Sequence, residues 1–336
     1  MRLSAMGDVA MTVPVLRAFV KQYPSVQVTV ISRPFFKPFF EGIPNVSFFA
    51  FDEKERHKGF LGLLRLFQDV RALHVDAFAD LHNVLRSQII RNLFLVTGKK
   101  VAAVDKGRAG KKELTRAVNK VFQQLPTMFE RHAEVFKTLG YPIDLSLELE
   151  FPQKTVLSAE ITDLIGENYQ KLIGIAPFAQ YDSKVYPLDL MKEVLAKLSE
   201  NKEHTILLFG GGKKEIEILD SLATPFKNVI NVAGKIKFQQ ELKLISNLDV
   251  MLSMDSGNAH IAAMLGVKVV TLWGATHPFA GFSPFNQPIE NALVSDREKY
   301  PMLPTSVYGN KKVEGYDEVM RTILPESVVS RIQSLL

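Results

Sequence analysis

The sequence predicts an α/β fold of two domains, each built on a doubly wound parallel sheet. Three observations predict it. Short β-rich runs alternate with helical patterns along the whole chain, the runs of the second half are apolar without interruption, and 336 residues are enough for two hydrophobic cores. Strands without polar alternation are buried on both faces, so helices must cover both faces of each sheet.

Each half of the chain carries its own series of elements. In the first half we predict strands over Val26–Ser32, Val46–Phe51, Asp76–Asp80 and Lys100–Val104, and helices over Thr12–Gln22, Phe60–Leu73, Val84–Val96, Glu113–Leu125 and Phe129–Leu139. In the second half we predict strands over Leu172–Ala176, Thr205–Phe209, Val229–Val232, Val250–Ser253 and Lys268–Trp273, and helices over Leu188–Ser199, Lys214–Leu222, Phe238–Ser246 and Asn258–Leu265.

The segment Tyr141–Thr155 interrupts this rhythm, because it holds two prolines and lacks a helical period. We interpret it as a linker between domains at 1–150 and 156–315. The last segment, 316–336, has a helical period, and we expect it to pack back toward the first domain. Two doubly wound sheets that face each other form a central cleft at the carboxyl ends of their strands, where ligands bind.

The chain begins with a strand-to-helix turn, Arg2–Asp8, followed by a helix. The central strand that should lead into this turn would precede Arg2, and only Met1 stands there. We therefore expect the first strand of the amino-terminal domain to be missing from the chain. Its absence would leave apolar helix faces and unpaired strand edges.

Composition excludes several classes of protein. The chain has no cysteine, which rules out disulfides, zinc–thiolate sites, iron–sulfur clusters and a cysteine nucleophile. It has no apolar run long enough to span a membrane, no secretory signal and no nucleic-acid-binding motif, so we expect a cytoplasmic protein without a nucleic-acid partner. A net charge of +5 suits an anionic substrate or an anionic membrane surface.

The most informative segment is Asp249–Thr276, in which a buried strand leads through Asp255, Ser256 and Gly257 into a helix. A helix start with unpaired N–H groups binds anions, and a diphosphate would fit there. His260, in the first turn, could add a hydrogen bond to phosphate. The alternative is an ordinary strand-to-helix turn with an exposed histidine.

Two further loops follow predicted strands. Gly210, Gly211 and Gly212 could let a ligand approach the backbone, and Glu215 could bind ribose hydroxyls, although a tight turn and a favourable first-turn acid explain them equally well. Lys184, in the loop Ala176–Pro187, could neutralise a leaving phosphate or be a solvated lysine.

Asp8 is either a first-turn helix acid or a general base. A free aspartate has a pKa near 3.9 and is a weak base, which partial burial would strengthen.

Basic residues gather in the first half, over Lys99–Arg116 and Arg56–Arg71. They suit a second anionic ligand, although most runs of charged residues only form the solvent-exposed face of a helix or loop. The apolar stretch Gly59–Phe67 could lie on a membrane, but packing on its own sheet explains it better.

Together these segments resemble the family 9 glycosyltransferases, which include the lipopolysaccharide heptosyltransferases. The resemblance runs nearly end to end. It rests on R-x-S-x-x-G-D at Arg2–Asp8, with a proline at Pro14, on Asp80–Ser87, and above all on D-S-G-x-x-H-I-A-A-x-L-G at Asp255–Gly266 followed by G-x-T-x-P at Gly274–Pro278.

The resemblance implies a GT-B fold, two Rossmann-like domains with the nucleotide sugar held mainly by the second. It also implies an inverting transfer from ADP-heptose to the inner core of lipopolysaccharide, with no obligatory metal or other cofactor. Peripheral contact with the inner membrane stays open. Asp8 would be the catalytic base. The donor would be bound by Lys184, Gly211, Gly212, Glu215, Asp255, Ser256, Gly257, His260 and Thr276, and the anionic acceptor by Arg56, Lys58, Arg86 and Lys111.

Two departures bear on this reading: the first strand is missing, and Leu303–Gly315 has no cysteine where many members carry several. Three alternatives remain: a transferase for another nucleotide sugar, a non-catalytic nucleotide-sugar-binding scaffold, and a nicotinamide-dependent oxidoreductase. The last is disfavoured because the G-x-G-x-x-G fingerprint is absent.

Overall fold

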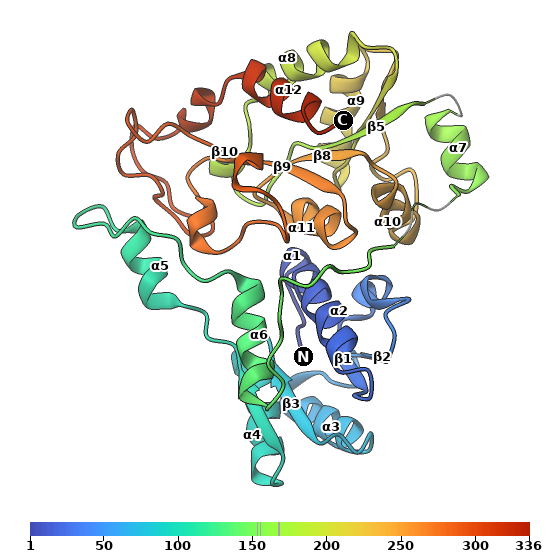
Figure 1. The fold of residues 1–336 in the computed structure, drawn as a ribbon, viewed down its shortest axis with the longest axis vertical. Coiled ribbons are helices and arrows are strands. Elements are labelled where there is room, and N and C mark those ends of the chain that lie inside the picture. The colour runs from blue at the N-terminus through green and yellow to red at the C-terminus, as the bar shows by residue number, and fades with distance from the viewer. Residues whose placement is uncertain (153, 155, 167–168) are drawn as a thin grey trace. The chain divides into compact units, whose positions relative to one another are not determined.

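The computed structural model of the chain describes residues 1–152, 154, 156–166 and 169–336. Contacts between residues divide these into two compact units (Figure 1). The first comprises Met1–Gly107 and Pro126–Glu150, and the second comprises Arg108–Leu125 and Phe151–Leu336. The second unit therefore includes a short segment from the first half of the sequence.

The second unit is built on one six-stranded, fully parallel sheet in the order β10-β9-β8-β5-β6-β7. Its strands are β5 (Lys171–Ala176), β6 (His204–Leu208), β7 (Val229–Asn231), β8 (Val250–Met254), β9 (Lys268–Trp273) and β10 (Ala292–Val294). The strands β6 and β8 are buried along their whole length, as their mostly apolar sequences predict, and the burial includes the polar side chains of His204, Thr205 and Ser253.

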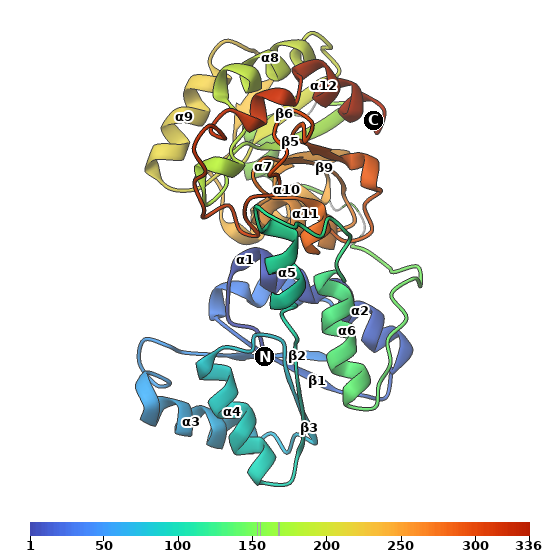
Figure 2. The ribbon, with the colours of Figure 1, turned by 90° about the vertical axis from the view of Figure 1, so that its left-hand side faces the viewer.

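Helices cover both faces of this sheet (Figures 1 and 2). On one face lie α8 (Leu188–Ser199), α9 (Lys213–Ala223) and α12 (Pro325–Gln333), and on the other lie α10 (Phe238–Ser246) and α11 (Gly257–Met264). The larger core fills the first of these layers, where Ile173, Ile206 and Leu252 of the strands pack with Leu195 of α8 and Val328 of α12.

The first unit contains two separate parallel strand pairs rather than one sheet. They are β1 (Val28–Ser32) with β2 (Val46–Ala50), and β3 (Ala77–Asp80) with β4 (Lys100–Ala103). The helices are α1 (Met6–Ala10), α2 (Thr12–Gln22), α3 (Gly59–Arg71), α4 (Leu85–Val96) and α6 (Met128–Thr138), and η1 (Pro34–Phe40) is a 3-10 helix. A core of apolar side chains from α3, α4 and the strands holds the two pairs together.

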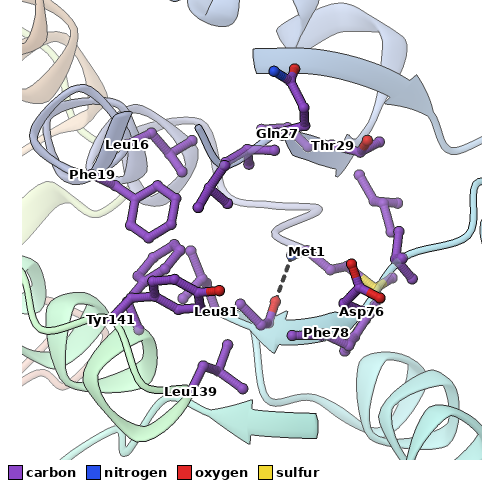
Figure 3. Close-up of a pocket in the computed structure, with 18 of the residues that line it drawn as sticks. Met1, Leu16, Phe19, Gln27, Thr29, Asp76, Phe78, Leu81, Leu139 and Tyr141 are labelled. Carbon is purple, nitrogen blue, oxygen red and sulfur yellow. Dashed lines mark hydrogen bonds between the residues drawn. The ribbon is translucent and has the colours of Figure 1, made fainter. Parts of the chain in front are cut away.

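A cavity of about 530 Å³ lies beside the facing edges of β1 and β3 (Figure 3). Among the described residues, Met1 and Arg2 hydrogen-bond to both edges. The Met1 amine donates to the Ala79 carbonyl at 2.7 Å, Leu81 N–H donates to the Met1 carbonyl at 3.1 Å, and Arg2 N–H donates to the Ile31 carbonyl at 3.1 Å. This is the hydrogen-bond pattern of the end of a parallel central strand.

Most predicted elements are confirmed to within a few residues, but the helix predicted over Glu113–Leu125 is wrong. The helix there is α5 (Arg108–Thr115), and the chain beyond it turns at Asn119, which has a positive φ of 52°. Leu125 then donates its N–H to the Phe279 carbonyl at 2.9 Å, which ties the segment to the second unit. This tertiary pairing overrides the helical pattern of the sequence.

Several short elements carry too little periodicity to be predicted: α7 (Ala159–Ile165), β10, and the 3-10 helices η2 (Asp182–Lys184), η3 (Pro278–Ala280), η4 (Ile289–Asn291) and η5 (Val319–Thr322). The predicted linker Tyr141–Thr155 has neither helix nor strand over its described part, and Gln153 and Thr155 lie outside the described residues. The expected domain boundaries, and contact between 316–336 and the first domain, stay predictions; α12 packs on α8 within the second unit.

Candidate functional site

The order of strands in the second unit places a topological switch point between β5 and β8. After β5 the chain continues to β6 and β7 on one side of the sheet, and it returns to β8, β9 and β10 on the other. The loops that leave β5 and β8 therefore diverge at the carboxyl edge, which is where open α/β sheets bind ligands. These are the loops that carry Lys184 and Asp255.

Lys184 and Asp255 form an ion pair across this point. Lys184 Nζ lies 3.1 Å from Asp255 Oδ2, and the two side chains are 12% and 10% exposed. A mostly buried ion pair holds both side chains in place, because neither charge can be left alone without a large desolvation cost. The lysine is thus fixed at the strand ends with its ammonium group beside Asp255.

The helix α11 begins directly after Asp255. Ser256 is its N-cap residue, but the Ser256 hydroxyl bonds to Ser253 Oγ at 3.1 Å and does not cap the helix. The first-turn N–H groups of α11 therefore do not donate to that hydroxyl and suit an anion. His260 follows in the first turn and is buried, which argues against the alternative of an exposed histidine, and its contact with phosphate stays a prediction.

The loop after β6 forms a tight entry into α9. Gly212 is the N-cap of α9 with a φ of +81°, a conformation that favours glycine. Glu215 accepts a hydrogen bond from Gly211 N–H at 2.8 Å and so stabilises its own loop. A ribose-binding role for Glu215 stays a prediction.

The loop after β9 packs on the Lys184 loop. A Cβ on Gly274 would lie 2.4 Å from the Ser183 carbonyl oxygen, and Ala275 N–H donates to the same oxygen at 3.1 Å. Thr276 is 2% exposed, and its hydroxyl has no hydrogen-bond partner within the described residues. Reasoning from sequence did not single out Gly274 or Ser183, although the G-x-T-x-P segment contains the first.

Asp8 lies in the first unit, in the first turn of α1. Its Oδ2 lies 2.6 Å from Arg2 Nη2 and accepts the Ala5 N–H at 3.2 Å. Arg2 is buried and also donates to the Leu81 carbonyl at 2.8 Å. Sequence reasoning missed Arg2 as the partner of Asp8.

Burial and the positive charges of Arg2 and Lys106 lower the pKa of nearby His82 to about 4, so this histidine is neutral at physiological pH.

The four predicted acceptor residues are divided between the two units. Arg56, Lys58 and Arg86 belong to the first unit, where Arg56 pairs with Asp69 at 2.6 Å and Arg86 pairs with Glu53 at 3.2 Å. Lys111 belongs to the second unit and lies over the ring of Phe282 at 4.2 Å. Asp8 and the donor residues likewise lie in different units, so a cleft that brings them together stays a prediction.

The family model of glycosyltransferase family 9 (heptosyltransferase) matches residues 63–311, more than half of the chain. The chain belongs to glycosyltransferase family 9. It is therefore a glycosyltransferase, and the oxidoreductase alternative is excluded.

Other family 9 proteins are similar over most of their length. The lipopolysaccharide core heptosyltransferase OpsX of Haemophilus influenzae is 26% identical over 85% of this chain and 81% of its own. Lipopolysaccharide heptosyltransferase 2 of Salmonella typhimurium is 26% identical over 99% of this chain and 96% of its own.

Solved structures agree on the fold. The family 9 glycosyltransferase of Veillonella parvula has a TM-score of 0.74 at 19% identity, covering 99% of this chain and 95% of its own. The ADP-heptose heptosyltransferase II of Escherichia coli has a TM-score of 0.68 at 21% identity, and the match covers 100% of this chain and 98% of its own. The GT-B architecture expected from the sequence is thus confirmed.

The described residues contain neither a candidate metal-binding cluster nor a helix that could span a membrane. Within them, no three or more histidine, aspartate or glutamate side chains are grouped so that they could hold a metal ion. None of the helices they form is both long enough and apolar enough to cross a membrane.

Proposed function

We propose that this family 9 glycosyltransferase transfers heptose from ADP-heptose to the inner core of lipopolysaccharide. The names of its relatives support the sugar and the acceptor. The observation that carries the proposal is the Lys184–Asp255 ion pair, which fixes a cation at the carboxyl edge of the sheet next to the start of α11. A cation beside helix N–H groups suits the diphosphate of a nucleotide sugar.

The proposed reaction is an inverting displacement. An acceptor hydroxyl oxygen attacks the anomeric carbon, Asp8 accepts the hydroxyl proton, and the bond from that carbon to the diphosphate oxygen breaks as ADP leaves. Lys184 and the first-turn N–H groups of α11 stabilise the charge that develops on the leaving diphosphate. Because these groups offset that charge, we propose that no metal or other cofactor is required.

The remaining donor contacts that we propose come from the loops after the carboxyl ends of the strands. Gly211 and Gly212 would lie against the nucleotide, Glu215 would bind its ribose, and Thr276 and His260 would complete the phosphate contacts. The acceptor is an anionic lipopolysaccharide precursor bound by basic side chains, and the enzyme would meet it at the cytoplasmic face of the inner membrane.

Calorimetry and transfer assays test this proposal. We expect ADP, and not UDP or GDP, to bind, and chelation by EDTA to leave transfer unchanged. Asp8→Asn should lower transfer by at least tenfold and leave ADP affinity nearly unchanged, since the carboxylate acts on the acceptor. Binding of UDP in place of ADP would identify a different donor. ADP binding without transfer from ADP-heptose would indicate a non-catalytic binding protein.

A further inference from the structure

The strands of the first unit have a topological switch point of their own. Met1 and Arg2 lie between β1 and β3 and hydrogen-bond to both. From there the chain runs to β1 and β2 on one side, and it returns to β3 and β4 on the other. The turn after Arg2 and the loop after β3 therefore diverge at the carboxyl edge, which is where open α/β sheets bind ligands. The turn carries Asp8, and the loop carries His82.

Arg2 links the turn to the loop. Its Nη2 lies 2.6 Å from Asp8 Oδ2, and its Nη1 donates to the Leu81 carbonyl at 2.8 Å. Leu81 directly precedes His82 in the sequence. One buried guanidinium group therefore holds the Asp8 carboxylate in a set position relative to the backbone that carries His82.

The loop after β3 is also fixed by Asp80, which is fully buried at the end of that strand. Asp80 Oδ1 accepts the N–H groups of His82 at 3.1 Å and Asn83 at 2.7 Å. Arg91 of α4 lies 3.3 Å from the other carboxylate oxygen and balances its charge. The backbone of His82 is thus held by a charge-assisted hydrogen bond, and its ring does not belong to a mobile surface loop.

The two nitrogens of the His82 ring have different surroundings. His82 is 9% exposed, and its Nδ1 is buried without a hydrogen-bond partner among the described residues. Nε2 is not enclosed in this way, and no described residue hydrogen-bonds to it. A polar ring that is buried without partners lowers the free energy of unfolding. A ligand that bonds to Nε2 would offset part of this cost.

The charge state of His82 limits the kind of group that it can contact. Burial, together with the positive charges of Arg2 and Lys106, lowers the pKa of His82 to about 4. A neutral imidazole carries no charge that would attract an anion, and it pairs with a neutral polar group instead. A sugar hydroxyl both donates and accepts, so it can bond to Nε2 in either tautomer of the ring.

We propose that His82 contacts the acceptor sugar and hydrogen-bonds one of its hydroxyl groups through Nε2. This contact holds the sugar so that the attacking hydroxyl faces Asp8, which accepts the proton. The inference rests on the proposed function, in which Asp8 is the base. Ordering a reactant against the group that deprotonates it lowers the entropic part of the barrier.

Transfer from ADP-heptose to heptose-deficient lipopolysaccharide, measured on the full chain, tests this contact. His82→Leu removes the hydrogen bond, whereas His82→Gln keeps a hydrogen-bonding group. The matched control is His132→Leu. His132 of α6 is wholly buried, so no ligand reaches it, and burial with the charge of Arg2 lowers its pKa to about 3. The control therefore removes another neutral histidine from the surroundings of Arg2.

We expect His82→Leu to raise the KM for the acceptor and to lower kcat/KM by about tenfold, which is the effect of one lost hydrogen bond. His82→Gln should retain most of the parent activity, and the control should match the parent. The KM for ADP-heptose and the affinity for ADP should stay the same in every variant. His82→Leu should melt no lower than the parent, because the enclosed Nδ1 has no partner to lose. A lower melting temperature with an unchanged acceptor KM would show a structural role and overturn the proposal.

Two further measurements complete the test. The acidic limb of the pH profile of kcat/KM should be the same in the parent and in His82→Gln, because the ring is not the base; a shifted limb would overturn the proposal. Acceptor affinity is also measured directly in the presence of ADP, so that the contact is tested without turnover. A parent chain that binds the acceptor without transferring heptose would refute the proposed function, whereas equal acceptor affinity in the parent and His82→Leu would overturn the role of His82.

Discussion

The amino terminus of the chain offers a sharp test of the first unit. The Met1 amine is buried beside β3, and burial lowers its pKa from 8.0 to about 6. We predict that an amino-terminal extension Val-Ile-Val-Ile stabilises this unit. The extension converts the amine to a neutral peptide N–H and places apolar side chains along the open edges of β1 and β3, where the register set by Met1 and Arg2 continues.

The magnitude follows from two contributions. A fall of the pKa from 8.0 to about 6 corresponds to roughly 3 kcal/mol of lost stability when the amine is charged in both states. Because the folded pKa lies below the unfolded one, this loss is complete below pH 6 and disappears as the pH rises through 8. Burial of each added apolar side chain increases the free energy of unfolding by about 1.5–3 kcal/mol, and the ordering of each added residue's backbone lowers it by about 1–2 kcal/mol. We therefore expect a gain of at least about 3 kcal/mol at pH 6.

Thermal and urea unfolding at pH 6 and pH 8.5 measure this gain. The parent chain should have a lower free energy of unfolding at pH 6 than at pH 8.5. In the extended chain, which lacks the buried amine, the part of this difference that the amine causes should disappear. Acetylation of the amine is the matched control for charge, and an extension Gly-Ser-Gly-Ser is the control for apolar burial. An extended chain no more stable than the Gly-Ser control at both pH values would refute the argument that the cavity accepts a strand.

The remaining predictions concern the second unit. Lys184→Met should weaken ADP binding and cost up to about 3–5 kcal/mol, since it leaves the Asp255 carboxylate buried without a partner; adding Asp255→Asn should recover stability in urea unfolding but not ADP affinity in calorimetry. Gly274→Ala should cost about 1–3 kcal/mol and weaken ADP binding, because its methyl group meets a backbone oxygen at 2.4 Å, whereas Gly211→Ala enters open space and should leave thermal stability unchanged. Burial raises the pKa of Glu241 from 4.5 to about 7, so its contribution to the free energy of unfolding should fall as pH rises from about 4.5 to 7, because the unfolded chain loses this proton first. A Glu241→Gln variant whose free energy of unfolding falls as steeply over this pH range would contradict this.

Local sequence determined much of this protein. The mostly apolar strands of the second unit, the helices between them and the turn Asp255–Gly257 all follow from residue type and spacing, because a strand buried on both faces has few polar side chains. The resemblance of Asp255–Gly266 to one family was equally local, and it led to the correct family.

Tertiary structure decided where residues far apart in sequence meet. The helical pattern of Glu113–Leu125 did not survive, because its apolar side chains and the Leu125 N–H find partners near Phe279. The same pairing joins α5 to the second unit. Arg2 with Asp8, and Ser183 with Gly274, are likewise contacts that no local pattern encodes. Spacing along a chain fixes the period of an element and its buried face, whereas the partner of each side chain depends on how the elements pack.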